Sequence, residues 1–245
     1  MAVPSAALAY RRSALMTATK VTTKPPSEEV LRARDDFKDF CVFMGKAPAK
    51  HMLEWHAELC TGEDSECLMG IGGPNTSILA PRGSAKSTVL GLFAAWMIGR
   101  HAAAKKMLRI LYIAYMVDIS RAKSATIKGI LTSNKYREVF PMVRLSKIKR
   151  SDEYWSIDYD FAGIDTAGEE AFTIACGGLK GAITSKRSQL VLIDDPIKSA
   201  ASINNPDIRR EMEQTWSNVI APTMFQGARA TVSYTHLTLP TILLV

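Results

Sequence analysis

The stretch LAPRGSAKST, from Leu79 to Thr88, joins a short apolar segment to a long apolar one. It ends in Lys-Ser-Thr as a phosphate-binding P-loop does, but Ala80 and Ala85 stand where the GxxxxGK[ST] pattern has its glycines. Alanine is the next smallest residue, so it damages this pattern less than any other substitution would. The flanking segments predict a strand over 77–80 and a helix over 87–101, which is the context that a P-loop requires.

The side chains of this loop are of the types that bind phosphate. In a P-loop, Lys86 would reach the β- and γ-phosphates and Ser87 would place its hydroxyl on Mg²⁺. Arg82 adds a guanidinium that can meet a phosphate or stabilise charge developing on the γ-phosphoryl oxygens. Gly83 supplies flexibility at the bend. Taken alone, the same residues also fit a chance turn of small residues.

Two adjacent aspartates follow the apolar run of QLVLIDDP, predicted as a buried strand over 189–193. A P-loop ATPase needs a carboxylate at the end of a neighbouring strand to hold Mg²⁺, and many have a second one for the attacking water. The pattern predicts Asp194 for the metal and Asp195 for the water. The alternative is a turn or helix cap, because Asp before Pro is common turn chemistry. Together with the loop, the pair favours a Mg²⁺-dependent NTPase with an intervening strand.

Strands and helices are predicted to alternate along the chain. The predicted helices lie over about 27–44, 49–60, 87–101, 119–140 and 205–220, and the predicted strands over 77–80, 108–116, 154–161, 169–176 and 189–193. Such alternation indicates a mostly parallel sheet with helices on both faces. The expected fold class is therefore α/β, a P-loop NTPase of the ASCE (RecA-like) type.

The composition is that of a globular protein of 245 residues with a formal charge of +7 and a pI near 9.2. The charge favours an anionic partner such as nucleic acid, although it also fits a membrane surface or ordinary solubility. Four cysteines without a CxxC pair predict a reduced setting. No run of 18 apolar residues occurs, so no membrane span is expected.

Both ends of the chain are unusual. Residues 1–26 are basic and are predicted as a flexible arm. The C-terminus reads VSYTHLTLPTILLV, and its first ten residues resemble the translation of a transposon-derived sequencing-library adapter. We therefore expect the natural sequence to depart near Thr231 and residues 232–245 to be a non-native tail. The alternative is a genuine β-strand, since Thr, Val and Leu suit one.

Several segments, in order, resemble the ATPase region of the large terminase subunit of tailed bacteriophages. They are APRGSAKST, an arginine-containing Walker A variant; ILYIAYMVDISRAKSATIKGIL with YREVFP, the second strand and helix; and GGLKGAITSKRSQLVLIDDPIKSA with the helix of Trp216, the Walker B region. The resemblance runs from about Phe37 to Thr231. It implies an ATPase domain over 27–231.

The resemblance also implies roles for individual residues. Asp194 and Ser87 would hold Mg²⁺, and Asp195 would replace the catalytic Glu of many relatives, with a side chain one methylene shorter. The adenine contact would fall near Phe43 to His56. The residues that would bind ATP are Arg82, Gly83, Ser84, Ala85, Lys86, Ser87 and Thr88, with Arg82 and Lys86 also catalytic.

The implied biology is that of a packaging motor. Its partners would be double-stranded DNA, a portal protein, a small terminase subunit and further copies of the chain in a ring, in the host cytoplasm at the procapsid portal vertex. By this resemblance the ATPase fold would be incomplete at the C-terminus and the nuclease domain that follows in the family would be missing, so nuclease activity is expected of the parent protein only. Lys180, Lys186 and Arg187 could contact DNA, but a solvated loop is the simpler interpretation.

Two other functions remain open at this point. A helicase or other nucleic-acid remodelling ATPase shares the nucleotide chemistry and the basic charge. A nucleotide-binding assembly module would bind ATP without turnover. Magnesium-dependent hydrolysis that is lost in Lys86→Ala separates the module from the two enzymes.

Overall fold

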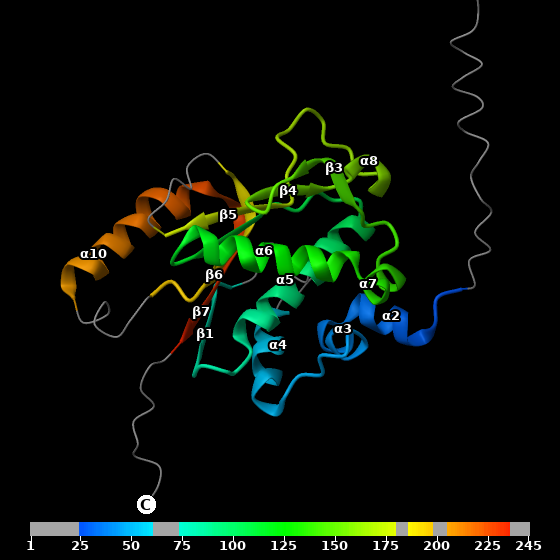
Figure 1. Ribbon diagram of the computed structural model, residues 1–245, viewed down its shortest axis with the longest axis horizontal. Coiled ribbons are helices and arrows are strands. Elements are labelled where there is room, and N and C mark those ends of the chain that lie inside the picture. Colours follow the sequence, from blue (N-terminus) through cyan, green and yellow to red (C-terminus); the bar gives the residue numbers. More distant parts are fainter. Residues whose placement is uncertain (1–24, 61–73, 180–185, 198–204, 236–245) are drawn as a thin grey trace, which may run out of the picture.

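The computed structural model describes residues 25–60, 74–179, 186–197 and 205–235 (Figure 1). Within these residues no helix is both long and apolar enough to cross a membrane. The helices are α2 Glu28–Asp35, α3 Phe37–Phe43, η1 Lys50–Met52, α4 Leu53–Leu59, α5 Lys86–Ala103, α6 Val117–Thr132, α7 Asn134–Val139, α8 Tyr159–Ala162, α10 Pro206–Thr215, η3 Trp216–Ile220 and η4 Ala221–Thr223. The strands are β1 Thr76–Ala80, β2 Ile110–Ala114, β3 Leu145–Arg150, β4 Tyr154–Ile157, β5 Ile174–Gly178, β6 Ser188–Asp194 and β7 Met224–Thr235.

These strands form one seven-stranded sheet in the order β1-β7-β6-β2-β5-β4-β3. All neighbours from β1 to β5 in this order pair in parallel, whereas β4 pairs antiparallel with both β5 and β3. Strand β7 lies between β1, which leads into the P-loop, and β6, which carries the aspartates. The predicted α/β class and its intervening strand are thus confirmed.

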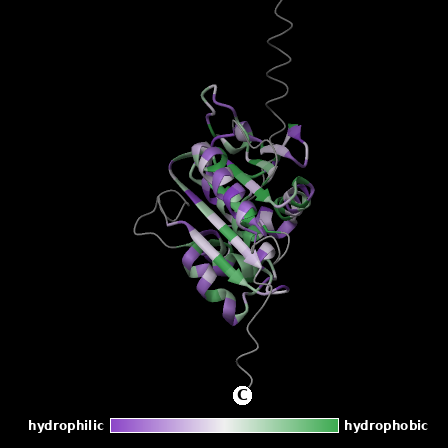
Figure 2. Cartoon of the chain, turned by 90° about the vertical axis from the view of Figure 1, so that its left-hand side faces the viewer, coloured by the Kyte–Doolittle hydropathy of each residue, from purple (hydrophilic) through white to green (hydrophobic). Residues whose placement is uncertain are grey.

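Helices cover both faces of this sheet, as predicted. In β6, Leu190 and Leu192 belong to a core that includes α3, α5, α6 and α7, while Val191 and Ile193 belong to a second core with η3. This alternation follows from the two-residue period of a strand. In Figure 2 much of the sheet is coloured hydrophobic, and hydrophilic colour is frequent on the surrounding helices. The central strands are therefore buried on both sides, as in other parallel sheets.

Two predicted helices are interrupted by a capping residue. The helix predicted over 27–44 is wrong as one element, because Asp36 ends α2 in an extended conformation and its carboxylate accepts a hydrogen bond from the N–H of Asp39 to start α3. The helix predicted over 119–140 breaks in the same way at Ser133, whose hydroxyl accepts from the N–H of Tyr136. Short polar side chains favour such caps over a helix interior.

The strand predicted over 154–161 is shorter than expected. It ends at Ile157, because the carboxylate of Asp158 accepts a hydrogen bond from the N–H of Phe161 and caps the single turn α8. The other predicted strands and helices are present with shifted ends. Residues 1–24 of the predicted arm lie outside the described residues.

Strand β7 extends through Val232–Thr235, the first four residues of the predicted tail. Thr231 pairs with Thr76 of β1 and with Leu192 of β6, and the pairing continues on both sides of β7 beyond it. These four residues thus have the strand conformation that was predicted for the case of a genuine β-strand. Their origin is a separate question, which the gene sequence answers. Residues 236–245 lie outside the described part of the chain.

A buried arginine ties β7 to the N-terminal helices. The guanidinium of Arg229 donates to the carbonyls of Leu59 at 2.9 Å and Glu58 at 2.6 Å and to the hydroxyl of Thr76 at 2.5 Å. The two carbonyls are at the end of α4, where helical acceptors lack intrahelical donors. Arg229 therefore joins α4, β1 and β7 at the start of β1, the end of the strand opposite the P-loop.

Candidate nucleotide site

The P-loop connects the end of β1 at Ala80 to the start of α5 at Lys86. Gly83 (φ 81°) and Ala85 (φ 61°) both have the left-handed backbone conformation. The first helical hydrogen bond of α5 is donated by the N–H of Val89 to the carbonyl of Ala85. The three N–H groups of α5 that precede Val89 therefore have no backbone carbonyl acceptor within the helix. N–H groups at such a turn and helix end form an anion-binding site.

The structure distinguishes the two alanines that replace P-loop glycines. Ala80 is the last residue of β1 and needs no unusual conformation. Ala85, the residue before α5, has φ 61° and ψ 22°, a conformation that costs a residue with a β-carbon on the order of 1–2 kcal/mol. At Ala85 the backbone angle therefore matters as well as the small size of the side chain, whereas at Ala80 it does not.

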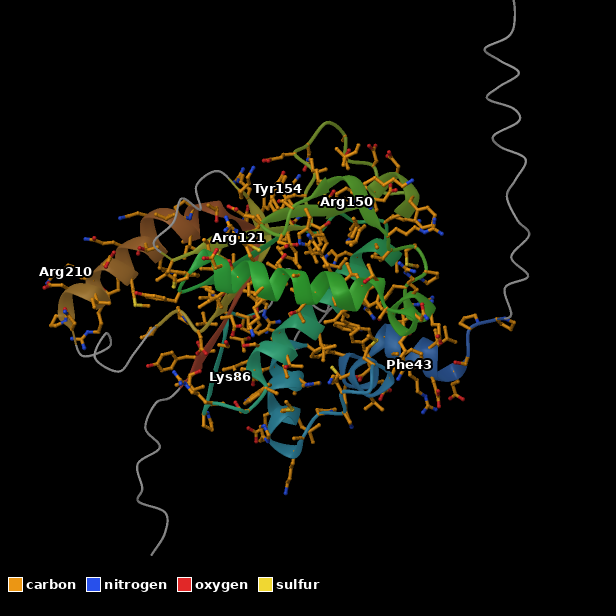
Figure 3. The ribbon with its side chains drawn as sticks, in the orientation of Figure 1. Phe43, Lys86, Arg121, Arg150, Tyr154 and Arg210 are labelled. Carbon is orange, nitrogen blue, oxygen red and sulfur yellow. The ribbon has the colours of Figure 1, made fainter. Side chains whose placement is uncertain are left out.

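Lys86 is folded back against the loop. Its side chain is buried (6% exposed), and its ammonium donates to the carbonyls of Ala80 at 2.7 Å and Pro81 at 3.0 Å. The hydroxyl of Ser84 also donates to Pro81, at 2.7 Å. Figure 3 shows Lys86 near the ends of β1 and β7, on the opposite side of the molecule from Tyr154. The ammonium group of Lys86 is thus held beside the residues at which the loop begins.

A cavity of about 430 Å³ lies over this loop. Its lining brings together seven consecutive loop residues, Arg82 to Thr88, with Asp195 and Thr235. The structure thus places every residue of the predicted ATP-binding set beside Asp195, which is more than 100 positions later in sequence. Asp194 is not among the lining residues.

Asp194 ends β6 and is almost fully buried (2% exposed). Asp194 lies on the same face of β6 as Leu190 and Leu192, two residues that pack in the core containing α5. Its carboxylate accepts hydrogen bonds from the hydroxyls of Tyr112 at 3.2 Å and Ser233 at 2.5 Å. Burial, and then the charge of Asp194, raise the pKa of Tyr112 well above its usual range, so the phenol stays protonated as a donor at neutral pH.

Asp195 has left the strand and turns toward the cavity. Its backbone has φ 45°, and its N–H donates to the carbonyl of Ser233 at 3.0 Å. Its carboxylate accepts from the N–H of Thr235 at 2.8 Å and from the hydroxyl of the same residue at 2.7 Å. The two aspartates therefore have different surroundings: one is buried beneath the site and the other lines it.

The oxygen donors of the site suit Mg²⁺. Ser87 offers a hydroxyl on the first turn of α5 and Asp194 a carboxylate on the same face of the sheet. A carboxylate has about four lone-pair positions, so two hydrogen bonds leave room for a metal or its water ligands. No group of three His, Cys, Asp or Glu side chains suited to a metal occurs among the described residues. Mg²⁺ bound with a nucleotide needs no such group, because phosphates and water complete its shell.

Two solved structures are similar to this chain. One is the large terminase ATPase domain of Thermus phage P74-26, with 15% identity, a TM-score of 0.48 and coverage of 87% of this chain and 71% of that one. The other is the N-terminal domain of the DNA packaging ATPase of bacteriophage phi29, with 14% identity, a TM-score of 0.41 and coverage of 71% and 78%. No protein-family model and no curated protein matches the sequence. At this identity the likeness concerns the fold alone.

A second cavity, of about 210 Å³, adjoins the first turn of α5 on another side. It contains residues that the sequence did not single out, because α6 brings them from a distant segment. Met44 and Lys46 come from the segment assigned to the adenine contact, and Phe43 at its start is labelled in Figure 3. The lining residues are Met44, Lys46, Ser87, Thr88, Gly91, Leu92, Lys123, Thr126 and Ile130. A lining of apolar side chains with two lysines suits a flat, partly polar group.

The basic residues considered for DNA have partners within the chain. Lys186 pairs with Glu170 and lies 4.7 Å from the ring centre of Tyr154. The guanidinium of Arg187 lies 4.9 Å from the ring centre of Phe225. These contacts occupy the faces of the two rings. Lys180 lies outside the described residues.

Proposed function

We propose that this chain is a Mg²⁺-dependent ATP hydrolase that drives movement of double-stranded DNA. The observation that carries the proposal is the cavity that joins the whole loop from Arg82 to Thr88 with Asp195. A cradle of N–H groups, a lysine and a carboxylate at one sheet edge are the parts that phosphoryl transfer to water requires. The intervening strand β7 agrees with this interpretation.

The proposed roles follow from the chemistry of each group. The loop N–H groups and Lys86 bind the phosphates, and Arg82, exposed on the cavity, stabilises charge on the γ-phosphoryl oxygens. Asp195 orients the attacking water and accepts its proton. Ser87 and Asp194 hold the metal, which when bound neutralises charge on the phosphates.

We propose that the second cavity receives the base or ribose of the same nucleotide. Ser87 and Thr88 line both cavities, so a ligand with its phosphates at the loop can reach either one. Met44, Leu92 and Ile130 offer apolar contacts to a base. This assignment narrows the adenine segment, Phe43 to His56, to its first residues.

The DNA-packaging role rests on the sequence motifs and on the charge of +7. The proposed partners are double-stranded DNA, a portal protein, a small terminase subunit and further copies of the chain in a ring at the procapsid. The proposed location is the host cytoplasm at the portal vertex. The proposed ATPase domain is 27–231, and endonuclease activity is proposed for a further domain of the parent protein.

Phosphate release from ATP by the 245-residue chain, with and without Mg²⁺ and duplex DNA, tests the proposal. We expect Mg²⁺-dependent hydrolysis that Lys86→Ala abolishes and that Lys38→Ala, an exposed lysine on α3, leaves unchanged. ATP binding without turnover would favour the assembly module instead. Strand separation of duplex DNA coupled to hydrolysis would favour the helicase alternative. Equal activity of the wild type and Lys86→Ala would contradict the assigned site.

A further inference from the structure

We propose that Tyr112 is a positioning residue that orients Asp194 to hold the metal, an inference that rests on the proposed nucleotide site. The phenolic hydroxyl lies 3.2 Å from Oδ2 of Asp194 and donates a hydrogen bond to it. The two residues are on adjacent parallel strands, where Ala114 of β2 is paired with Asp194 of β6. Tyr112, two residues before Ala114, lies on the same face of β2 and reaches along the sheet to the carboxylate.

The donor is fixed in place by its surroundings. Tyr112 is fully buried in the core cluster that also contains Ile110, Leu190 and Leu192. A ring packed on all sides cannot swing away, so its hydroxyl defines where Oδ2 lies. An unanchored carboxylate rotates about its last bond and offers either oxygen to a metal. The phenol removes this freedom before any ligand arrives.

The type of donor is also informative. Two hydroxyl groups reach the carboxylate of Asp194, and no ion pair of the described residues includes it. An Arg or Lys in the place of Tyr112 would also orient the carboxylate but would neutralise its charge. A neutral phenol leaves the full negative charge for a cation, as the outer contacts of metal ligands often do.

The contact does not depend on the origin of the C-terminal residues. Ser233, the other donor to Asp194, belongs to the predicted tail, whereas Tyr112 and Asp194 both precede Thr231. If the natural residue at position 233 differs, Tyr112 remains as an anchor of the carboxylate.

Binding of Mn²⁺ in the presence of ADP, measured by electron paramagnetic resonance on the 245-residue chain, tests the inference. We expect Tyr112→Phe to weaken Mn²⁺ binding about tenfold, because loss of an outer contact to a metal ligand typically weakens binding by this order. ADP binding without metal should not change. Tyr136→Phe is the matched control, because its buried hydroxyl donates to the carbonyl of Ala95 at 2.8 Å, away from Asp194.

A kinetic measurement separates positioning from a general loss of stability. Hydrolysis by Tyr112→Phe should need about tenfold more Mg²⁺ for half-maximal rate and approach the wild-type rate when Mg²⁺ is saturating. Wild-type Mn²⁺ affinity in Tyr112→Phe, or an equal loss in Tyr136→Phe, would overturn the inference. Failure of the unsubstituted chain to bind Mn²⁺ with ADP would contradict the proposed function itself, and this inference with it.

Discussion

Gly83 and Ala85, two residues apart in the P-loop, share the left-handed backbone conformation, with φ 81° and 61°. Between them they turn the chain from the end of β1 into the first turn of α5. Only glycine adopts this conformation without a penalty, since a β-carbon crowds the following carbonyl. The loop therefore has a left-handed residue directly before α5, at a position where its sequence lacks the usual glycine.

Replacing Ala85 with glycine should stabilise the chain. We expect Ala85→Gly to raise the free energy of unfolding by about 1 kcal/mol, because the strain is relieved. Ala125→Gly, at an exposed position in α6, should instead lower it by about 1 kcal/mol, since glycine disfavours helix. Urea denaturation measures both changes. A loss of stability in Ala85→Gly equal to that in Ala125→Gly would contradict the left-handed assignment.

Asp195→Asn should separate hydrolysis from binding. Asparagine has the same shape and tolerates the positive φ of 45°, so the fold should not change. It cannot accept a proton from water, and we expect the turnover rate to fall by about 10²- to 10⁴-fold. Titration with a fluorescent ATP analogue should give nearly the wild-type affinity. Wild-type turnover in this variant would remove Asp195 from its proposed role.

Gly99 of α5 allows a close approach that no other residue permits. A β-carbon there would lie 2.3 Å from the ring of Phe140, which is fully buried. Gly99→Ala should therefore lower the free energy of unfolding by about 2–3 kcal/mol. Gly91→Ala, on the same helix, places its β-carbon 3.9 Å from Ile127 and should be neutral or stabilising by up to about 1 kcal/mol. Thermal denaturation of the two variants should rank them in this order.

His101 should make the fold sensitive to acid. Burial lowers its pKa from 6.5 to about 4, although its Nδ1 bonds to the carbonyl of Met97 at 2.9 Å. As pH falls below 6.5, the unfolded chain binds the proton before the folded one does, so stability is lost down to about pH 4. Between pH 7 and pH 5 the loss from this residue should be about 2 kcal/mol.

His101→Gln keeps a donor for Met97 but does not titrate. The free energy of unfolding, measured with urea at both pH values, should therefore fall less in this variant than in the wild type. Burial also lowers the pKa of His56, and that contribution remains in both proteins. An identical acid dependence in the two would show that His101 is not the titrating group.

The end of the gene can be tested without the protein. We expect sequencing across codon 231 with a different library chemistry to give other codons after Thr231. Because β7 lies between β1 and β6, the natural residues should still form a strand there. Recovery of the same codons would instead make Val232–Thr235 native, with Ser233 and Thr235 as true partners of the aspartates.

The sequence by itself determined the parts of the site that are local. Lys86 and Ser87 follow a loop of small residues and begin a helix, and Asp194 and Asp195 end an apolar strand. The sequence also determined the α/β class. The spacing of hydrophobic residues distinguishes strands from helices, and the alternation of the two along the chain indicates a mostly parallel sheet covered by helices. These features need only neighbouring residues to be recognised.

Tertiary structure decided how these parts meet. The sequence predicts that a strand lies between the strand of the P-loop and the strand of the aspartates, but not which strand it is. Only the assembled sheet shows that β7 lies between β1 and β6 and that Tyr112 lies beside Asp194. The conformation of Ala85 is likewise set by the need to join β1 to α5, against its own preference. The second cavity needs α5 and α6 packed together. Contacts between distant segments depend on packing energy summed over the whole core, and for this reason they cannot be predicted from local residue patterns.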